Sequence, residues 1–196
     1  MIRVIRLLLW LLVLLAGAGL AYLALRPAPE TQPPRGMASL GGPFTLVGAD
    51  GRPFSSARLN GRPYAIFFGF THCPDVCPTT LARMVRLRNQ LGSGAEAFDI
   101  LFVSVDPARD GPGEVGAYAG LFGSPVIGLT GSQAQIDQVK KQFGIFSQQA
   151  PDGAGGYTID HTATVLLFDK SGKFDSTISP EEQDPAALAK LKRITD

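Results

Sequence analysis

The sequence predicts an α/β domain in which helices flank a central mixed β-sheet. Two continuously apolar runs, residues 64–70 and 99–105, are typical of strands that are buried on both faces. Segments with helical spacing follow both runs, and this alternation favours parallel strands joined by helices. Two further apolar runs around a short turn, residues 162–168 and 173–178, predict an antiparallel pair, which makes the sheet mixed.

An N-terminal hairpin is the first expected element of this domain. Residues 44–47 and 53–54 are apolar, and Asp50 and Gly51 supply a turn between them. After the first buried run, a helix is expected to begin near Pro78, whose missing N–H needs no partner in a first helical turn. The apolar face of this helix is expected to comprise Leu81, Met84, Val85 and Leu91.

The second half of the domain repeats the alternation of strands and helices. A helix is expected near residues 112–122, and a short strand follows at 125–129. Ser132 and Gln135 form a capping-box pair that starts the next helix, and Gly144 ends it. A last helix after the antiparallel pair is expected to start at Asp184 and to carry Leu188, Leu191 and Ile194 on one face.

The first 25 residues are expected to form a membrane anchor. Residues 7–25 carry no charge and are about long enough to cross a bilayer as one helix. Arg3 and Arg6 precede this run and favour a cytoplasmic N-terminus, which predicts a single-pass protein of the inner (cytoplasmic) membrane with its soluble domain in the periplasm. A cleaved secretory signal is the alternative, although the apolar run is longer than a typical signal core.

The rest of the chain divides into a linker and one domain. Residues 26–43 are rich in proline and glycine, which predicts an extended linker, and residues 44–196 are enough for a single domain with its own core. Without residues 1–25, which carry Arg3 and Arg6, the formal net charge changes from +1 to −1. Nucleic-acid binding therefore has no electrostatic support, and no nucleic-acid partner is expected.

The only two cysteines, Cys73 and Cys77, lie between a predicted strand and a predicted helix. The insert of three residues between them is one longer than in a C-x-x-C redox motif, and it permits either a metal site or a reversible disulfide. The helix N-terminus beyond Cys77 is expected to lower the pKa of at least one thiol. A purely structural disulfide is a further alternative, but it would close only a short loop.

One histidine is expected to face these cysteines. A thiol pair after a central strand and at the start of a helix is where the thioredoxin architecture keeps its redox cysteines, and oxidoreductases of that architecture carry a cis-proline opposite them. No proline occurs between Pro151 and Pro180 in this chain. His161 stands at the corresponding place, at the expected start of a strand, and so completes a Cys–Cys–His set.

Copper is the metal that this set fits best. Two thiolates and one imidazole suit Cu(I) in a trigonal arrangement, and two thiolates leave Cu(II) neutral and Cu(I) with one negative charge, so both oxidation states are tolerable. Zinc with three protein ligands and a water is the competitor. Against a hydrolytic zinc centre, no carboxylate other than Asp75 or Asp160 is placed as a base.

Three segments together resemble the Sco/SenC family of membrane-anchored copper proteins. They are Thr-His-Cys-Pro-Asp-Val-Cys-Pro at residues 71–78, Val-Ser-Val-Asp-Pro-Ala-Arg-Asp at 103–110 and Asp-His-Thr at 160–162. The resemblance covers the domain from about residue 44 onward and implies a thioredoxin-like fold. It also implies that Cys73, Cys77 and His161 are copper ligands and that the two cysteines are a redox-active dithiol.

The same resemblance implies a function and partners. A metallochaperone of this family delivers copper to the copper A site of cytochrome c oxidase, or helps that site to mature by reducing its cysteines. The expected partners are the copper-bearing subunit of the oxidase and another periplasmic copper chaperone or thiol reductant. The alternative function is that of a thiol-disulfide oxidoreductase acting on that target or another exported protein, and a classical enzyme is not expected.

The residues around this set have weaker expected roles. His72 is not expected to share an ion with its neighbour Cys73, and Asp160 is a candidate to orient His161, with simple solvation as the alternative. A turn with an ion pair, and no chemistry, is expected from Asp106, Arg109 and Asp110. Residues 147–160 contain three glycines and are expected to form a mobile loop that delivers His161 and opens and closes the third ligand position.

Overall fold

The computed structural model of the chain describes residues 6, 10, 15, 40–92, 98–123 and 126–196. Apart from residues 6, 10 and 15, the expected anchor, residues 1–25, lies outside these ranges, and so does most of the expected linker. Within them, no helix has both the length and the apolar character required to cross a bilayer. The sheet, the helices that cover it and the cysteine loop all belong to one unit, Gly36–Asp196.

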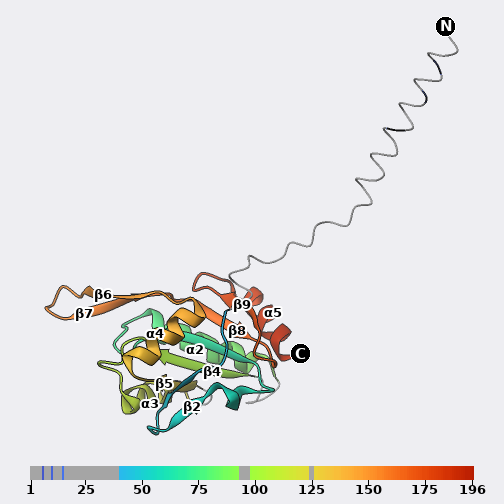
Figure 1. The fold of residues 1–196 in the computed structure, drawn as a ribbon. Coiled ribbons are helices and arrows are strands. Elements are labelled where there is room, and N and C mark those ends of the chain that lie inside the picture. Colours follow the sequence, from blue (N-terminus) through green and yellow to red (C-terminus); the bar gives the residue numbers. More distant parts are fainter. Residues whose placement is uncertain (1–5, 7–9, 11–14, 16–39, 93–97, 124–125) are drawn as a thin grey trace. The chain divides into compact units, whose positions relative to one another are not determined.

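A seven-stranded mixed sheet forms the centre of this unit, as the sequence predicts (Figure 1). The strand order across the sheet is β2-β1-β5-β4-β3-β8-β9. Strand β3 pairs in parallel with β4, and β4 with β5, whereas all the other pairs are antiparallel. The strands are β1 (Thr45–Gly48), β2 (Pro53–Ser55), β3 (Tyr64–Gly69), β4 (Asp99–Ser104), β5 (Val126–Thr130), β8 (Val165–Phe168) and β9 (Phe174–Ile178).

Helices cover both faces of the sheet. They are α2 (Val76–Gln90), α3 (Pro112–Gly120), α4 (Gln133–Phe143) and α5 (Asp184–Thr195), and a 3₁₀ turn, Ser56–Leu59, follows β2. Apolar residues of α2, α3 and α5 pack in one core cluster with Ala65 and Phe67 of β3, whereas α4 packs in the other with Ile66 and Phe68. Because successive side chains of a strand point to opposite faces, α4 lies on the face opposite the other three helices.

Local sequence signals account for most of these elements. All six residues of β3 are buried, as its continuous apolar run predicts. The capping box of Ser132 and Gln135 is formed at the start of α4, and Gly144 ends that helix at a φ of 67°, in the left-handed region that favours glycine. Helix α2 begins two residues before Pro78, so Cys77 already belongs to its first turn.

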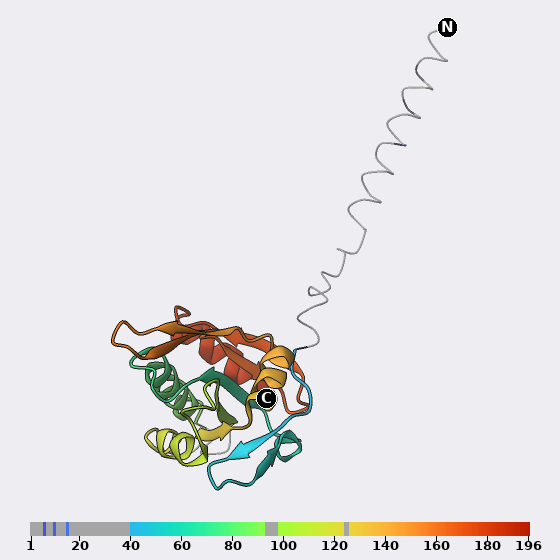
Figure 2. The same cartoon turned by 60° about the vertical axis from the view of Figure 1, so that its left-hand side comes forward.

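The prediction that residues 147–160 form a loop is wrong for most of this segment. Strands β6 (Ser147–Pro151) and β7 (Tyr157–His161) pair antiparallel as a separate two-stranded sheet, with Ser147 opposite His161. Figures 1 and 2 show this hairpin, in orange, along one margin of the domain. His161 therefore ends a strand and does not begin one. The sequence signal is weak because β6 is mostly polar and exposed, and only Ile159 is buried on β7.

Burial on both faces predicts that β3 is highly sensitive to truncation. Phe68→Ala removes a fully buried ring and is expected to lower the free energy of unfolding by about 3–5 kcal/mol. Urea unfolding of the full chain followed by circular dichroism would measure this loss. Leu121→Ala is the control, because Leu121 is 76% exposed and its removal should change stability by less than about 0.5 kcal/mol. Equal effects of the two substitutions would contradict the assignment of β3 to the core.

Candidate metal centre

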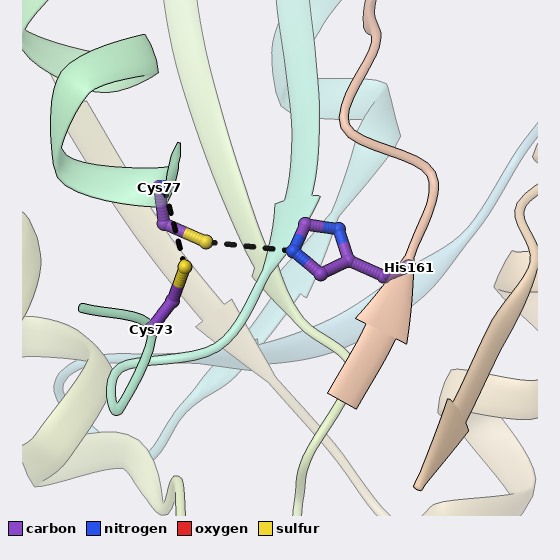
Figure 3. A group of neighbouring side chains, drawn as sticks. All are labelled: Cys73, Cys77 and His161. Carbon is purple, nitrogen blue, oxygen red and sulfur yellow. Dashed lines mark hydrogen bonds between the residues drawn. The ribbon is translucent and has the colours of Figure 1, made fainter. Parts of the chain in front are cut away.

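Cys73, Cys77 and His161 come together from three separate elements. Their ligand atoms all lie within 4.8 Å of one another (Figure 3). Cys73 is in the loop after β3, Cys77 is in the first turn of α2, and His161 is the last residue of β7. The grouping expected from the sequence is thus present, although the strand that carries the histidine differs from the one expected.

The fold brings the two sulfurs together at the start of α2. The Cys73 N–H donates to the carbonyl of Phe70 at 3.2 Å, which turns the loop, and the Cys77 N–H donates to Cys73 Sγ at 3.4 Å. Cys77 is fully buried and Cys73 is half-buried. A Cβ on Gly69 would lie 2.7 Å from Cys77 Sγ, so the absence of a side chain at Gly69 makes room for the buried sulfur.

The imidazole of His161 presents one nitrogen to the sulfurs and the other to the backbone. Nε2 lies 3.6 Å from Cys77 Sγ, and Nδ1 lies 3.1 Å from the carbonyl oxygen of Thr162. Because a carbonyl can only accept, Nδ1 carries the proton and Nε2 keeps its lone pair for a metal. The Thr162 carbonyl takes the orienting role considered for Asp160, whose exposed carboxylate acts on His161 through its charge.

Aromatic side chains surround the imidazole on its other sides. The rings of Phe67 and Phe70 meet His161 edge to face, with centroid distances of 6.0 and 5.8 Å. These contacts come from the end of β3 and from the residue after it. They pack against the ring and contribute to its partial burial.

Burial sets the protonation states of Cys77 and His161 in the metal-free group. It raises the pKa of the Cys77 thiol well above its usual value, and the neighbouring Cys73 adds to this rise, although a backbone hydrogen bond from Phe70 opposes it. The prediction that the helix N-terminus lowers a thiol pKa is therefore wrong for Cys77. Burial also lowers the pKa of His161, so its imidazole is neutral near pH 7. Cys73 and Cys77 are free thiols.

The donor set fits a soft metal ion. Two sulfurs and one imidazole nitrogen match the preference of copper, and within the described ranges no carboxylate belongs to the group. Asp75, one candidate base for a zinc centre, instead accepts a hydrogen bond from the Thr79 hydroxyl at 3.3 Å. His72 is not part of the group either: its Nδ1 lies 3.1 Å from Thr71 Oγ1, and its side chain is 54% exposed.

A buried polar cluster behind the cysteine loop is the feature that sequence reasoning missed. The expected ion pair between Asp106 and Arg109 is present, but Asp106 is only 2% exposed and Asp110 is fully buried. Asp110 accepts hydrogen bonds from both the N–H and the hydroxyl of Thr71, two residues before Cys73. The sequence signal that could have revealed it is the set of charged residues Asp106, Arg109 and Asp110 just after β4. Strand β4 pairs in parallel with β3, so the two strands end side by side.

Comparison with known proteins identifies relatives over most of the chain. The SCO1/SenC family model matches residues 32–196. The mitochondrial protein SCO2 of Saccharomyces cerevisiae is 33% identical over 92% of this chain and 64% of its own length, so the chain spans a little under two thirds of that relative. A SCO2-like protein of Rickettsia conorii is 36% identical over 82% of this chain and 83% of its own.

Solved structures show the same fold. The structure of Bradyrhizobium japonicum ScoI with copper bound has a TM-score of 0.71 and 38% identity, covering 79% of this chain and 99% of that one. Yeast Sco1 with copper bound has a TM-score of 0.71 and 30% identity, covering 79% and 87%. BsSco, with a TM-score of 0.63 and 25% identity over 80% and 94%, has a disulfide switch and is described as a member of the Sco family of cytochrome c oxidase assembly proteins.

These similarities agree with the fold and with the donor set. The solved relatives have the thioredoxin-like arrangement, several of them hold copper, and this chain brings together a Cys–Cys–His group that could bind copper. With a family model matched from residue 32 to the last residue and relatives at 33% and 36% identity, the chain belongs to the SCO1/SenC family.

Proposed function

We propose that this protein is a copper metallochaperone that binds the ion through Cys73, Cys77 and His161. The observation that carries the proposal is the meeting of two sulfurs and one imidazole nitrogen within 4.8 Å. The neutral imidazole offers the lone pair of Nε2, and the two thiols can lose their protons, so three ligands are present, which is enough for Cu(I). With Cu(II), two thiolates would balance the charge of the ion. The copper-bound structures of ScoI and Sco1 support the choice of metal.

The destination of the copper is also part of the proposal. We infer delivery to, or maturation of, the copper A site of cytochrome c oxidase, because BsSco belongs to a family of assembly proteins for that enzyme. The partner would be the copper-bearing subunit of the oxidase, with another periplasmic copper chaperone or a thiol reductant as the source of copper or electrons. Residues 1–25 would anchor the chain in the inner membrane, and residues 26–43 would link the anchor to the copper-binding domain, residues 44–196, in the periplasm.

Thiol-disulfide exchange is a second candidate function, favoured by the two free thiols and by the disulfide switch of BsSco. The Cys73 thiolate would attack a disulfide of the target and form a mixed disulfide, and one target cysteine would leave as a thiolate. Cys77 would then lose its proton and attack Cys73, which releases the second target thiolate. Two electrons would pass to the target, which takes up two protons, and a Cys73–Cys77 disulfide would remain.

Replacement of His161 tests the three-ligand set. Anaerobic Cu(I) titration of the full reduced chain in detergent is expected to show about one ion per chain, and His161→Ala should lower the affinity at least about tenfold because one of three ligands is lost. His72→Ala is the matched control, since His72 is the only other histidine and lies outside the group. Equally tight binding by wild type and His161→Ala would rule out the proposed ligand set.

The protonation states predict how copper binding depends on pH. Because burial raises the pKa of the Cys77 thiol, this group is protonated at neutral pH and must release its proton as copper binds, whereas the neutral His161 needs no release. The Cu(I) affinity should therefore rise with pH, by about tenfold per pH unit for each thiol proton released. Competition against a Cu(I) chelator across neutral pH would measure the slope, and a flat profile would contradict thiolate ligation.

The two candidate functions differ in whether they need His161: copper binding requires its imidazole, and thiol exchange without copper does not. Exchange activity requires both sulfurs, so Cys73→Ser and Cys77→Ser should each abolish reduction of a target disulfide measured with a copper chelator present. His161→Ala should leave that reaction within about twofold of wild type while it weakens copper binding. A copper-free activity that is lost with His161→Ala would mean that the histidine serves the dithiol chemistry directly.

A further inference from the structure

We propose that the turn after β4 sets the distance between the thiols and the imidazole, with Arg109 holding the strand that carries His161. This inference rests on the proposed copper function and assigns positioning roles to residues that make no contact with the ion. The turn contains Asp106, Arg109 and Asp110, and its two carboxylates face different halves of the Cys–Cys–His group.

The thiol half of the group is held by Asp110. This carboxylate is fully buried, and it accepts hydrogen bonds from the Thr71 N–H at 2.9 Å, the Thr71 hydroxyl at 2.6 Å and the Ser104 hydroxyl at 2.6 Å. Thr71 precedes Cys73 by two residues. A charged acceptor with three donors is a strong anchor, so the start of the cysteine loop is fixed to the end of β4.

The imidazole half is held by Asp106 and Arg109 through Tyr157, the first residue of β7. The Tyr157 hydroxyl donates to Asp106 at 3.0 Å, and Arg109 Nη1 donates to the Tyr157 carbonyl at 2.9 Å. The Arg109 guanidinium also lies 3.8 Å from the centre of the Tyr157 ring, a cation–π contact, and its Nε donates to Asp106. The ring, the hydroxyl and the carbonyl of Tyr157 thus each contact the turn, and these contacts fix the start of β7.

The β6–β7 hairpin needs such an attachment. It does not pair with the seven-stranded sheet, and a two-stranded sheet alone is marginally stable. His161 lies four residues after Tyr157 on the same short strand, so a shift at Tyr157 moves the imidazole. Arg109 also lies 5.9 Å from the ring of Phe70, which in turn packs edge to face on His161. The turn thus contacts both sides of the site.

The two carboxylates act as one unit because they are tied to each other. The N–H groups of Arg109 and Asp110 both donate to the Asp106 carbonyl, at 3.2 and 2.9 Å. Ser104 bridges the pair, since its hydroxyl donates to Asp110 while accepting from the Asp106 N–H at 3.0 Å. A movement of the cysteine loop relative to the hairpin would therefore break buried hydrogen bonds to charged groups, which are costly to leave unmade.

A double-mutant cycle on Cu(I) affinity tests this positioning role. Arg109→Gln removes the cation–π contact and the bond to the Tyr157 carbonyl, and in the full reduced chain it is expected to weaken Cu(I) binding about tenfold, as residues that orient metal ligands do. If Arg109 acts through His161, the same substitution in a His161→Ala background should change the affinity less than about twofold. Equal losses in both backgrounds, or no loss in either, would overturn the proposal.

Hydrogen–deuterium exchange on the metal-free chain separates this inference from the copper function. Arg109→Gln should speed exchange of the amides in β7 while those of β3 stay protected, and Tyr157→Phe, which loses only the hydroxyl, should give a smaller change in the same direction. Arg193→Gln, which breaks an exposed ion pair with Asp175, is the control and should leave β7 unchanged. Unchanged amide exchange of β7 in Arg109→Gln would refute the positioning role, whatever copper binding shows. An unchanged Cu(I) affinity in the single variant His161→Ala would instead refute the proposed ligand set.

Discussion

The parallel pairing of β3 with β4 is the constraint on which the site depends. Gly69 and Ser104 are the last paired residues of these strands, and the Val105 N–H donates to the Gly69 carbonyl at 2.8 Å just beyond them. Because parallel strands end at the same edge of a sheet, the cysteine loop and the acidic turn leave the sheet side by side. The buried contact between Thr71 and Asp110 follows from that neighbourhood, and so does the placement of the thiols over the core.

The neutral forms of Cys77 and His161 explain how these two side chains are tolerated in an apolar setting. With the Cys77 thiol protonated and the imidazole neutral, their burial costs little desolvation free energy, whereas a buried thiolate or imidazolium would cost much more. The buried charges near the site, those of Asp106 and Asp110, are compensated by Arg109 and by hydrogen-bond donors. Buried charge is therefore kept in the supporting turn, whereas Cys77 stays neutral until its sulfur binds a metal ion or exchanges with a disulfide.

The elements of the seven-stranded sheet follow from local patterns, and the place of His161 follows from the thioredoxin architecture, but the supports of the site follow from neither. Several features depend only on residues that are close in sequence and can therefore be predicted from it: the apolar run of β3, the capping box of α4 and the order of strands and helices. The β6–β7 hairpin depends on contacts such as that of Tyr157 with Asp106, 51 residues away, and Asp110 reaches Thr71 across 39 residues. Spacing also cannot tell that the Thr162 carbonyl, and not the Asp160 carboxylate, takes the second nitrogen of His161, because both adjoin the histidine in sequence.

Unequal burial of the two sulfurs gives the proposed functions a common order of events. Cys73 is half-buried and Cys77 is fully buried, so an incoming ligand or disulfide meets Cys73 first. The Cys77 N–H donates to Cys73 Sγ, so the start of α2 holds the more exposed sulfur beside the buried one. In the proposed functions, Cys77 is therefore the more enclosed of the two sulfur ligands and the thiol that resolves a mixed disulfide. The two proposed functions thus share the two sulfurs, and only the proposed copper binding also needs the imidazole of His161.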